Sequence, residues 1–123
     1  MHDELAASEG TCHFAAIEDG TAIGSAAVAR EPPPWAPDRR PSWRLRGMAT
    51  ADDRRNERIG AAVLEAVIEH VRRSGGGLVW CNARTPALTF YERAGFTTRG
   101  EGWVDPKIGP HIAMELFVDP ARD

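Results

Sequence analysis

The segment from Ile59 to Arg73 constrains the fold most, because its apolar residues recur at the spacing of one helical face. Three glycines follow this segment, and glycine tolerates the left-handed backbone that ends many helices. The sequence therefore predicts an amphipathic helix that packs on a core with one face and stops at the glycines. The predicted apolar stripe consists of Gly60, Val63, Leu64, Val67 and Val71.

The residues from Met48 to Ile59 lead into this helix and form a basic segment. We expect a strand end, then a loop that carries Arg54, Arg55 and Arg58, then the first helical turn. The first turn of a helix presents unpaired backbone N–H groups at the positive end of the helix dipole. The segment is therefore a candidate phosphate site. A solvated basic loop in front of a core helix is the alternative interpretation.

Apolar segments on both sides of this helix read as strands, and they define a mixed α/β fold. Asp19-Gly20 between the first two segments is a hairpin signal, and a helix between two strands favours parallel pairing. Along the third strand, Trp43, Leu45 and Gly47 alternate with Arg44, Arg46 and Met48. The expected strands are Cys12–Ile17, Thr21–Arg30, Trp43–Thr50, Leu78–Cys81, Phe96–Val104 and His111–Val118, with a second helix from Thr85 to Gly95 and Thr85 as its N-cap.

Length and composition favour one domain over residues 1–123, with a frayed N-terminus at 1–10. A formal net charge of −3 argues against non-specific nucleic-acid binding. Two distant cysteines, Cys12 and Cys81, are too few for a disulfide framework, so we expect free thiols in a reducing cytoplasm. The sequence has no apolar run of membrane-spanning length and no Cys/His spacing typical of zinc, so we expect no membrane partner and no metal.

Two ordered motifs resemble the GCN5-related N-acetyltransferase (GNAT) family. Arg55-x-x-Arg58-x-Gly60 is similar to the Arg/Gln-x-x-Gly-x-Gly/Ala loop with which that family holds the pyrophosphate of acetyl-coenzyme A. Pro86–Phe96 is similar to the family's second signature, a helix with tyrosine followed by Gly-Phe. The resemblance covers about residues 12–118, and Arg58 stands in place of the central glycine of the loop.

The resemblance implies a GNAT-type mixed central sheet with flanking helices, shortened at the N-terminus so that the first strand and the leading helices are largely missing. It implies an N-acetyltransferase that moves an acetyl group from acetyl-coenzyme A, as co-substrate, to a primary amine by direct transfer in a ternary complex. The acceptor is expected to be a small-molecule amine or a protein N-terminus. A non-catalytic acyl-coenzyme A-binding or dimerising module is the alternative. Exposure of Trp35 or Trp103 on a short domain suggests a homodimer.

Individual residues have candidate roles, which come from the resemblance for Tyr91 and the coenzyme-binding residues and from side-chain chemistry for the candidate bases. Tyr91 is the candidate acid for the departing thiolate, and its alternative role is that of a half-buried core aromatic. His111 is a candidate base, with Glu101 as another; a histidine at a strand edge is otherwise structural. The proline-rich loop with Trp35 is either a wall of the acceptor pocket or a stiff connector. The predicted coenzyme-binding residues are Met48, Ala49, Thr50, Arg55, Asn56, Glu57, Arg58, Ile59, Gly60, Ala61 and Asn82, with Arg84 as the alternative to Asn82.

Overall fold

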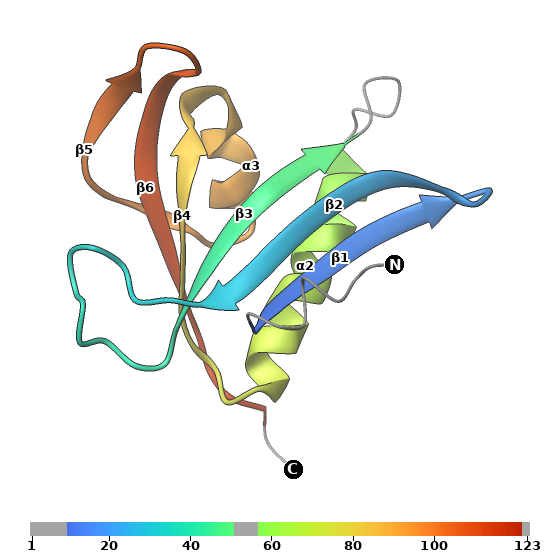
Figure 1. The fold of residues 1–123 in the computed structure, drawn as a ribbon, viewed down its shortest axis with the longest axis horizontal. Helices are drawn as coiled ribbons and strands as arrows, with labels where there is room; N and C mark the ends of the chain where they lie inside the picture. Colours follow the sequence, from blue (N-terminus) through green and yellow to red (C-terminus); the bar gives the residue numbers. More distant parts are fainter. Residues whose placement is uncertain (1–9, 51–56, 122–123) are drawn as a thin grey trace.

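The computed structural model describes residues 10–50 and 57–121, so the expectation of a frayed segment at 1–10 falls almost entirely outside the described residues. Six strands form one sheet in the order β1-β2-β3-β4-β6-β5, as Figure 1 shows. The strands are β1 Thr11–Glu18, β2 Thr21–Arg30, β3 Ser42–Thr50, β4 Gly77–Arg84, β5 Thr97–Asp105 and β6 Gly109–Val118. Helix α2 spans Glu57–Arg73, a 3-10 turn spans Thr85–Ala87, and helix α3 spans Leu88–Arg93.

The pairing confirms the predicted mixed sheet. Strands β3 and β4 pair in parallel, and α2 is the connection that crosses between them. Every other neighbouring pair of strands is antiparallel. The predicted Asp-Gly turn is present, since Asp19 and Gly20 have φ values of 51° and 79° between the paired residues Glu18 and Thr21. Positive φ at both central residues matches the right-handed twist of a two-residue hairpin.

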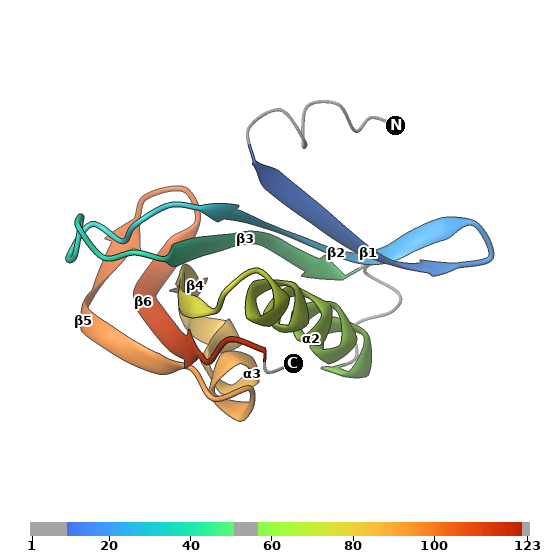
Figure 2. The same ribbon diagram turned by 90° about the horizontal axis from the view of Figure 1, so that it is seen from below.

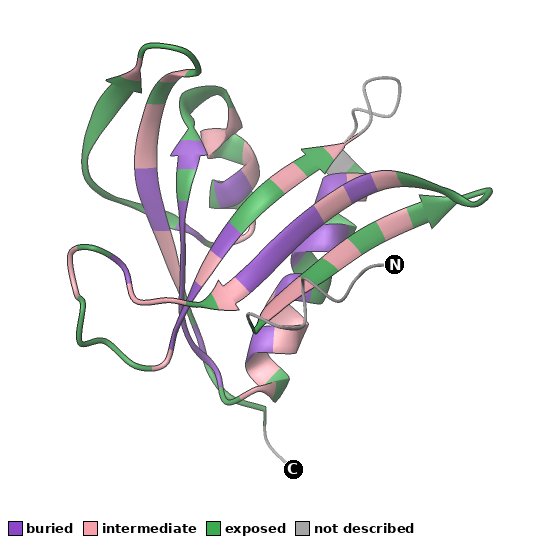
Figure 3. Cartoon of the chain, in the orientation of Figure 1, coloured by how far each residue is buried: buried purple, intermediate pink, exposed green. Residues whose placement is uncertain are grey.

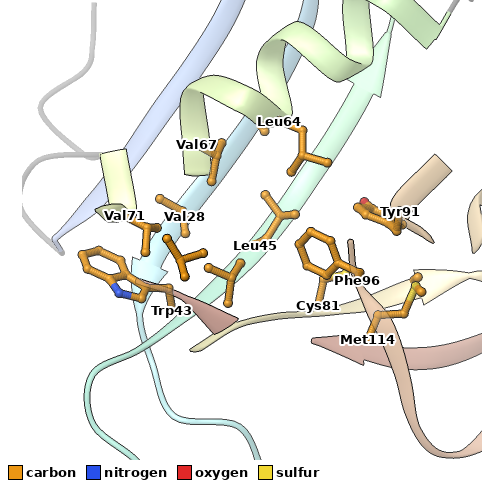
Figure 4. Close-up of a cluster of buried hydrophobic side chains, with 14 of the residues drawn as sticks. Val28, Trp43, Leu45, Leu64, Val67, Val71, Cys81, Tyr91, Phe96 and Met114 are labelled. Atoms are coloured by element: carbon orange, nitrogen blue, oxygen red, sulfur yellow. The ribbon is translucent and has the colours of Figure 1, made fainter. Parts of the chain in front are cut away.

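Helix α2 lies against one face of β1, β2 and β3, which is visible in Figure 2. Its predicted apolar stripe is buried, and Val67 and Val71 are fully inaccessible to solvent. These side chains meet Val28, Trp43 and Leu45 of the sheet (Figure 4). Each fully buried aliphatic side chain contributes about 1.5–3 kcal/mol relative to exposure, so this layer is a main source of stability. The opposite, outward side of α2 is exposed (Figure 3).

The three glycines end α2 as predicted. The N–H of Gly76 donates to the carbonyl of Val71 at 2.8 Å, and Trp43 Nε1–H donates to the Gly76 carbonyl at 3.1 Å. Gly75, Gly76 and Gly77 all have positive φ, between 71° and 127°. The chain therefore reverses tightly from α2 into β4, where a side chain on Gly76 or Gly77 would collide with backbone.

Several strand boundaries differ from the sequence prediction, and the end of β4 differs most. Strand β4 runs to Arg84 rather than ending at Cys81, because β6 pairs with it along its whole length. This pairing keeps Arg84 extended, with ψ of 141°, so Arg84 rather than Thr85 takes the N-cap position and makes no side-chain cap. The prediction of Thr85 as N-cap is wrong for this reason. Gly95 ends α3 as predicted, with φ of 103°.

Candidate active site

Strands β3 and β4 separate after a short paired segment. They pair at three positions, where Ser42, Trp43 and Arg44 face Leu78, Val79 and Trp80. Beyond this point β3 stays with β2, and β4 stays with β6. The two halves of the sheet therefore diverge, as the arrows of β3 and β4 show in Figure 1. Both diverging strands expose one backbone edge to the space between them.

A β-bulge lies on the diverging part of β3. Ser25 pairs with Ala49 and Ala27 pairs with Arg46, so two residues of β3, Gly47 and Met48, oppose one residue of β2. Gly47 has a φ of 71°, which a bulge of this kind requires of its first residue. The extra residue changes the face on which Met48 lies. Simple alternation placed Met48 with Arg44 and Arg46, whereas the structure packs it against the hydrophobic core.

A cavity of about 320 Å³ lies where the strands separate. We call it the splay cavity. It brings together residues that sequence analysis selected separately, among them Met48, Asn82, Tyr91 and His111. They come from β3, β4, α3 and β6, which are far apart in the chain. The remaining lining residues are Arg44, Leu45, Arg46, Gly47, Cys81, Ala83, Arg84, Ala87 and Ile108.

The splay cavity has two chemically different sides. Leu45, Cys81 and Tyr91 belong to the hydrophobic core that α2 covers. Side chains alternate along a strand, so Arg44 and Arg46 lie on the opposite, helix-free face from Leu45. The same rule places Asn82 and Arg84 opposite Cys81. One side is therefore apolar and the other is polar and cationic.

Tyr91 forms part of the apolar side. Its ring makes edge contacts with Phe90 at 5.1 Å and with Phe96 at 5.4 Å between ring centroids. The side chain is buried, and its hydroxyl end points from α3 toward β3 (Figure 4). Burial raises the pKa of the Tyr91 phenol above its ordinary value, with a smaller contribution from Cys81. The hydroxyl is therefore protonated at neutral pH and is able to donate a hydrogen bond into the cavity.

Cys81 lies beside Tyr91 on the same apolar side. Its side chain is 3% exposed, and burial raises the pKa of its thiol to about 12. A thiolate is the nucleophilic form of cysteine, so this thiol is inert at physiological pH. The structure thus supports the sequence-based interpretation of Cys81 as a buried, unreactive thiol.

His111 lies at the rim of the polar side, opposite Arg84 in the β4–β6 register. Its imidazole stacks on Trp103 at 5.6 Å between ring centroids. Nδ1 lies 2.9 Å from the carbonyl oxygen of Gly109, which accepts a hydrogen bond when Nδ1 carries the proton. In that tautomer Nε2 is the nitrogen that accepts a proton. Glu101, the other candidate base, is an exposed residue of β5 outside the lining of the splay cavity.

The predicted coenzyme-binding segment is divided by the structure. Arg55 and Asn56 lie outside the described residues, while Glu57 and the exposed Arg58 begin helix α2. A Cβ atom on Gly60 would lie 3.0 Å from the Phe90 ring and 4.0 Å from the Met48 methyl carbon. Gly60 therefore lets the first turns of α2 approach both α3 and the β3 bulge.

The other predicted coenzyme-binding residues do not line the splay cavity. Ala49 and Thr50 pair with β2 at the end of β3. Ile59 lies against Gly24 of β2, since a Cβ atom on Gly24 would be 2.8 Å from the Ile59 side chain. Ala61 lines a separate groove between α2 and α3. Their roles in coenzyme binding stay predictions.

Trp35 packs edge-on against Trp80, with 5.6 Å between ring centroids. Among the described residues it does not line the splay cavity, and it is half-buried rather than exposed.

Sequence reasoning missed the bulge and the joint role of Arg44 and Arg46 in the lining. The signals were present, as a glycine inside a strand and as two arginines two residues apart.

Comparison with protein families gives a match over residues 1–96 to the acetyltransferase (GNAT) family. The chain is also similar to an uncharacterized N-acetyltransferase, YitI, of Bacillus subtilis. The two are 34% identical over 115 residues, which cover 94% of this chain and 76% of the relative.

Solved structures share the fold. A putative acetyltransferase of the GNAT family from Desulfovibrio desulfuricans superposes with a TM-score of 0.72 at 28% identity, covering 93% of this chain and 72% of the other. An aminoglycoside 6′-N-acetyltransferase complexed with coenzyme A superposes with a TM-score of 0.71 at 16% identity, covering 98% of this chain and 79% of the other. None of the helices in the described ranges is long and apolar enough to cross a membrane.

Proposed function

Because this chain belongs to the GNAT family of acetyltransferases, we propose that it transfers the acetyl group of acetyl-coenzyme A directly to a primary amine within a ternary complex. The observation that carries the proposal is the splay cavity, which has Tyr91 on its apolar side and His111 on its polar side. A donor and an acceptor that enter from opposite faces meet between these two groups. Such positioning of two reactants supplies much of the rate of a bimolecular reaction.

The acyl donor fits the apolar side. Its pantetheine arm is extended and carries amides, which suit the exposed backbone edge of β3 at the bulge. The first turn of α2 adjoins this bulge through Gly60 and Met48, so its N–H groups are near enough to hold the attached phosphates. We assign phosphate binding to the segment from Arg55 to Ala61, and binding of the arm to Met48, Ala49 and Thr50. Asn82 lies on the polar side of the splay cavity, so its contact with the arm stays a prediction from the resemblance. Backbone N–H groups around Met48 stabilise negative charge on the acetyl oxygen.

The chemistry needs one proton acceptor and one proton donor. The neutral amine nitrogen forms a bond to the acetyl carbon, and the bond from that carbon to sulfur breaks. His111 Nε2 takes the proton that the amine loses, directly or through one water molecule. The Tyr91 hydroxyl donates to the departing sulfur. Because burial disfavours the tyrosinate, Tyr91 keeps its proton and stabilises the departing thiolate through a hydrogen bond, and the thiolate takes up its own proton from solvent.

An acyl-enzyme route through Cys81 is not part of the proposal. Its thiol is buried and neutral at physiological pH, so it does not compete with the amine for the acetyl group. Direct transfer predicts that both substrates bind before either product leaves.

Release of free coenzyme A from acetyl-coenzyme A, measured with a panel of primary amines, tests the proposal. Acetylated product identified by mass spectrometry, with intersecting rather than parallel initial-rate lines, supports direct transfer. Binding of acetyl-coenzyme A without turnover on any amine would instead support the alternative, a non-catalytic acyl-coenzyme A-binding or dimerising module.

A further inference from the structure

We propose that the acceptor is a small amine that also carries a carboxylate or phosphate group, and that Arg44, Arg46 and Arg84 bind this anionic group. The inference rests on the proposed acetyl transfer and adds the substrate class. It is carried by the arginines on the helix-free side of the splay cavity, the side opposite the apolar donor site.

Three backbone features bring these arginines together. Arg44 and Arg46 are two residues apart on β3, before the bulge, so both lie on the helix-free face. Arg84 is the last residue of β4 and pairs with His111 of β6. All four residues line the same cavity, so the three arginines share it with the candidate base.

The lining of the splay cavity contains no carboxylate among the described residues. Glu31 and Asp105, which contact or lie next to lining residues in the chain, are both engaged. Glu31 pairs with Arg44 at 3.4 Å, and Asp105 accepts hydrogen bonds from the N–H groups of Lys107 and Ile108 at 2.8 and 3.0 Å. A polyamine or another polycation would meet uncompensated positive charge at this entrance. An amine with an attached anionic group would instead place its negative charge against these arginines.

Arg44 is held in place before any acceptor arrives. Its guanidinium lies 5.1 Å from the Trp80 ring centroid, and Glu31 pairs with one terminal nitrogen. Its Nε is buried and has no hydrogen-bond partner within the described part of the chain. A buried donor without a partner is unfavourable unless a bound group satisfies it. Arg46 and Arg84 are exposed and make no ion pair with described residues, so their donors also remain available.

The position of these arginines separates them from the coenzyme phosphates. Phosphate binding is assigned to the first turn of α2, which lies on the other face of the sheet. Arg44, Arg46 and Arg84 therefore face the acceptor side. Guanidinium groups bind carboxylate and phosphate in paired hydrogen bonds, which makes both groups suitable anions here.

The test uses pairs of acceptors that differ in one anionic group. Glycine, β-alanine and 4-aminobutyrate are compared with their uncharged amides, and phosphoethanolamine is compared with ethanolamine. Spermidine serves as the polycation. We expect kcat/KM for at least one anionic acceptor to exceed that of its neutral partner by about tenfold or more. Glycine, β-alanine and 4-aminobutyrate differ in the number of carbons between amine and carboxylate. The one with the highest kcat/KM therefore indicates the distance between the anion site and the reacting amine.

Two variants locate the anion site. Arg46→Gln and Arg84→Gln should each raise KM for the preferred anionic acceptor by about tenfold, while leaving KM for its neutral partner within about twofold. The proposal places Arg84, which the resemblance offered as the alternative to Asn82 for the coenzyme, on the acceptor side instead. KM for acetyl-coenzyme A should therefore stay within about twofold in both variants. Arg73→Gln is the matched control, because it removes the same charge from an exposed position on α2 that is outside the cavity.

Each contrary result has a distinct meaning. Equal or better turnover of neutral amines or spermidine overturns the anionic acceptor and leaves acetyl transfer intact. A rise in KM for acetyl-coenzyme A in the variants overturns it too, because the arginines then hold the donor. If no amine is acetylated, the proposed function fails, and calorimetric titration of the coenzyme A-loaded protein with phosphoethanolamine and ethanolamine decides the anion site. Preferential binding of phosphoethanolamine that Arg46→Gln abolishes supports the site, and equal or absent binding overturns it.

Discussion

Tyr91 gives the sharpest test at the scale of single residues. Tyr91→Phe keeps the edge contacts with Phe90 and Phe96 and removes the hydroxyl alone. If the hydroxyl donates to the departing sulfur, kcat should fall by about 10²-fold with little change in the affinity for coenzyme A. Because burial raises the pKa of Tyr91 above 10.0, the wild type should show no loss of kcat from tyrosine ionisation below pH 10. An unchanged kcat in the variant would remove Tyr91 from the mechanism.

Cys81 gives the complementary residue-scale prediction. Cys81→Ala should keep kcat within about threefold of the wild type, because the thiol takes no part in direct transfer. A large loss of kcat in a folded variant would instead point to an acyl-enzyme. Alkylation with iodoacetamide at pH 8 should modify the half-buried Cys12 well before Cys81, whose thiolate fraction is about one in ten thousand at that pH.

The same thiol affects stability at alkaline pH. Its pKa rises from 9.0 to about 12 on burial, so the folded state binds this proton more tightly than the unfolded state does. Its contribution is fully present below pH 9 and is lost as pH rises toward 12. Thermal unfolding midpoints measured between pH 7 and 10.5 should therefore fall less for Cys81→Ala than for the wild type.

At the scale of elements, helix α2 and most strand positions follow from sequence because their apolar periodicity is unambiguous. The face of β3 on which Met48 lies could not be predicted, because alternation assumes a regular strand and the bulge at Gly47 adds one residue. The helix after β4 was misjudged for a similar reason. Pairing with β6, a contact distant in sequence, extends β4 to Arg84 and displaces Thr85 from the N-cap. Local patterns do not contain this information.

The turn between α2 and β4 offers a matched pair of substitutions. Gly75 and Gly76 both have positive φ, of 109° and 71°. A Cβ on Gly76 would lie 2.6 Å from the Val118 carbonyl oxygen, whereas a Cβ on Gly75 would meet nothing within 4 Å. Gly75→Ala should lower the free energy of unfolding by about 1–2 kcal/mol through backbone strain alone. Gly76→Ala should lower the free energy of unfolding by about 2 kcal/mol more than Gly75→Ala does, because neighbouring backbone atoms must also move. Urea unfolding of both variants measures the difference, and equal losses would contradict the packing described for this turn.

At the scale of the whole molecule, the sequence suggested a homodimer through Trp35 or Trp103. The structure leaves Trp103 of the β5–β6 hairpin 43% exposed, and Val104 and Ile108 beside it are 71% and 51% exposed. Trp35 is covered by Trp80 and is less suitable. We expect light scattering at micromolar concentration to give the mass of a dimer, and Val104→Glu to give a monomer. A monomeric wild type would contradict the expectation of a dimer, and a dimeric Val104→Glu variant would show that the interface lies elsewhere.

The divergence of β3 from β4 also makes the stability of the whole molecule depend on its ligand. Three residue pairs join the two halves of the sheet there, so a molecule that fills the splay cavity adds contacts between halves that share little backbone pairing. Coenzyme A at 100 times its Kd should stabilise the fold by about 2.7 kcal/mol, which raises Tm by roughly 10 °C for a domain of this size. Adenosine 3′,5′-bisphosphate, which lacks the pantetheine arm, is the control. It should raise Tm less and leave the amides of Leu45–Thr50 no better protected from hydrogen exchange, whereas coenzyme A should protect them. Equal protection by both ligands would show that the arm does not lie along β3, and the donor site would then have to be placed outside the splay cavity.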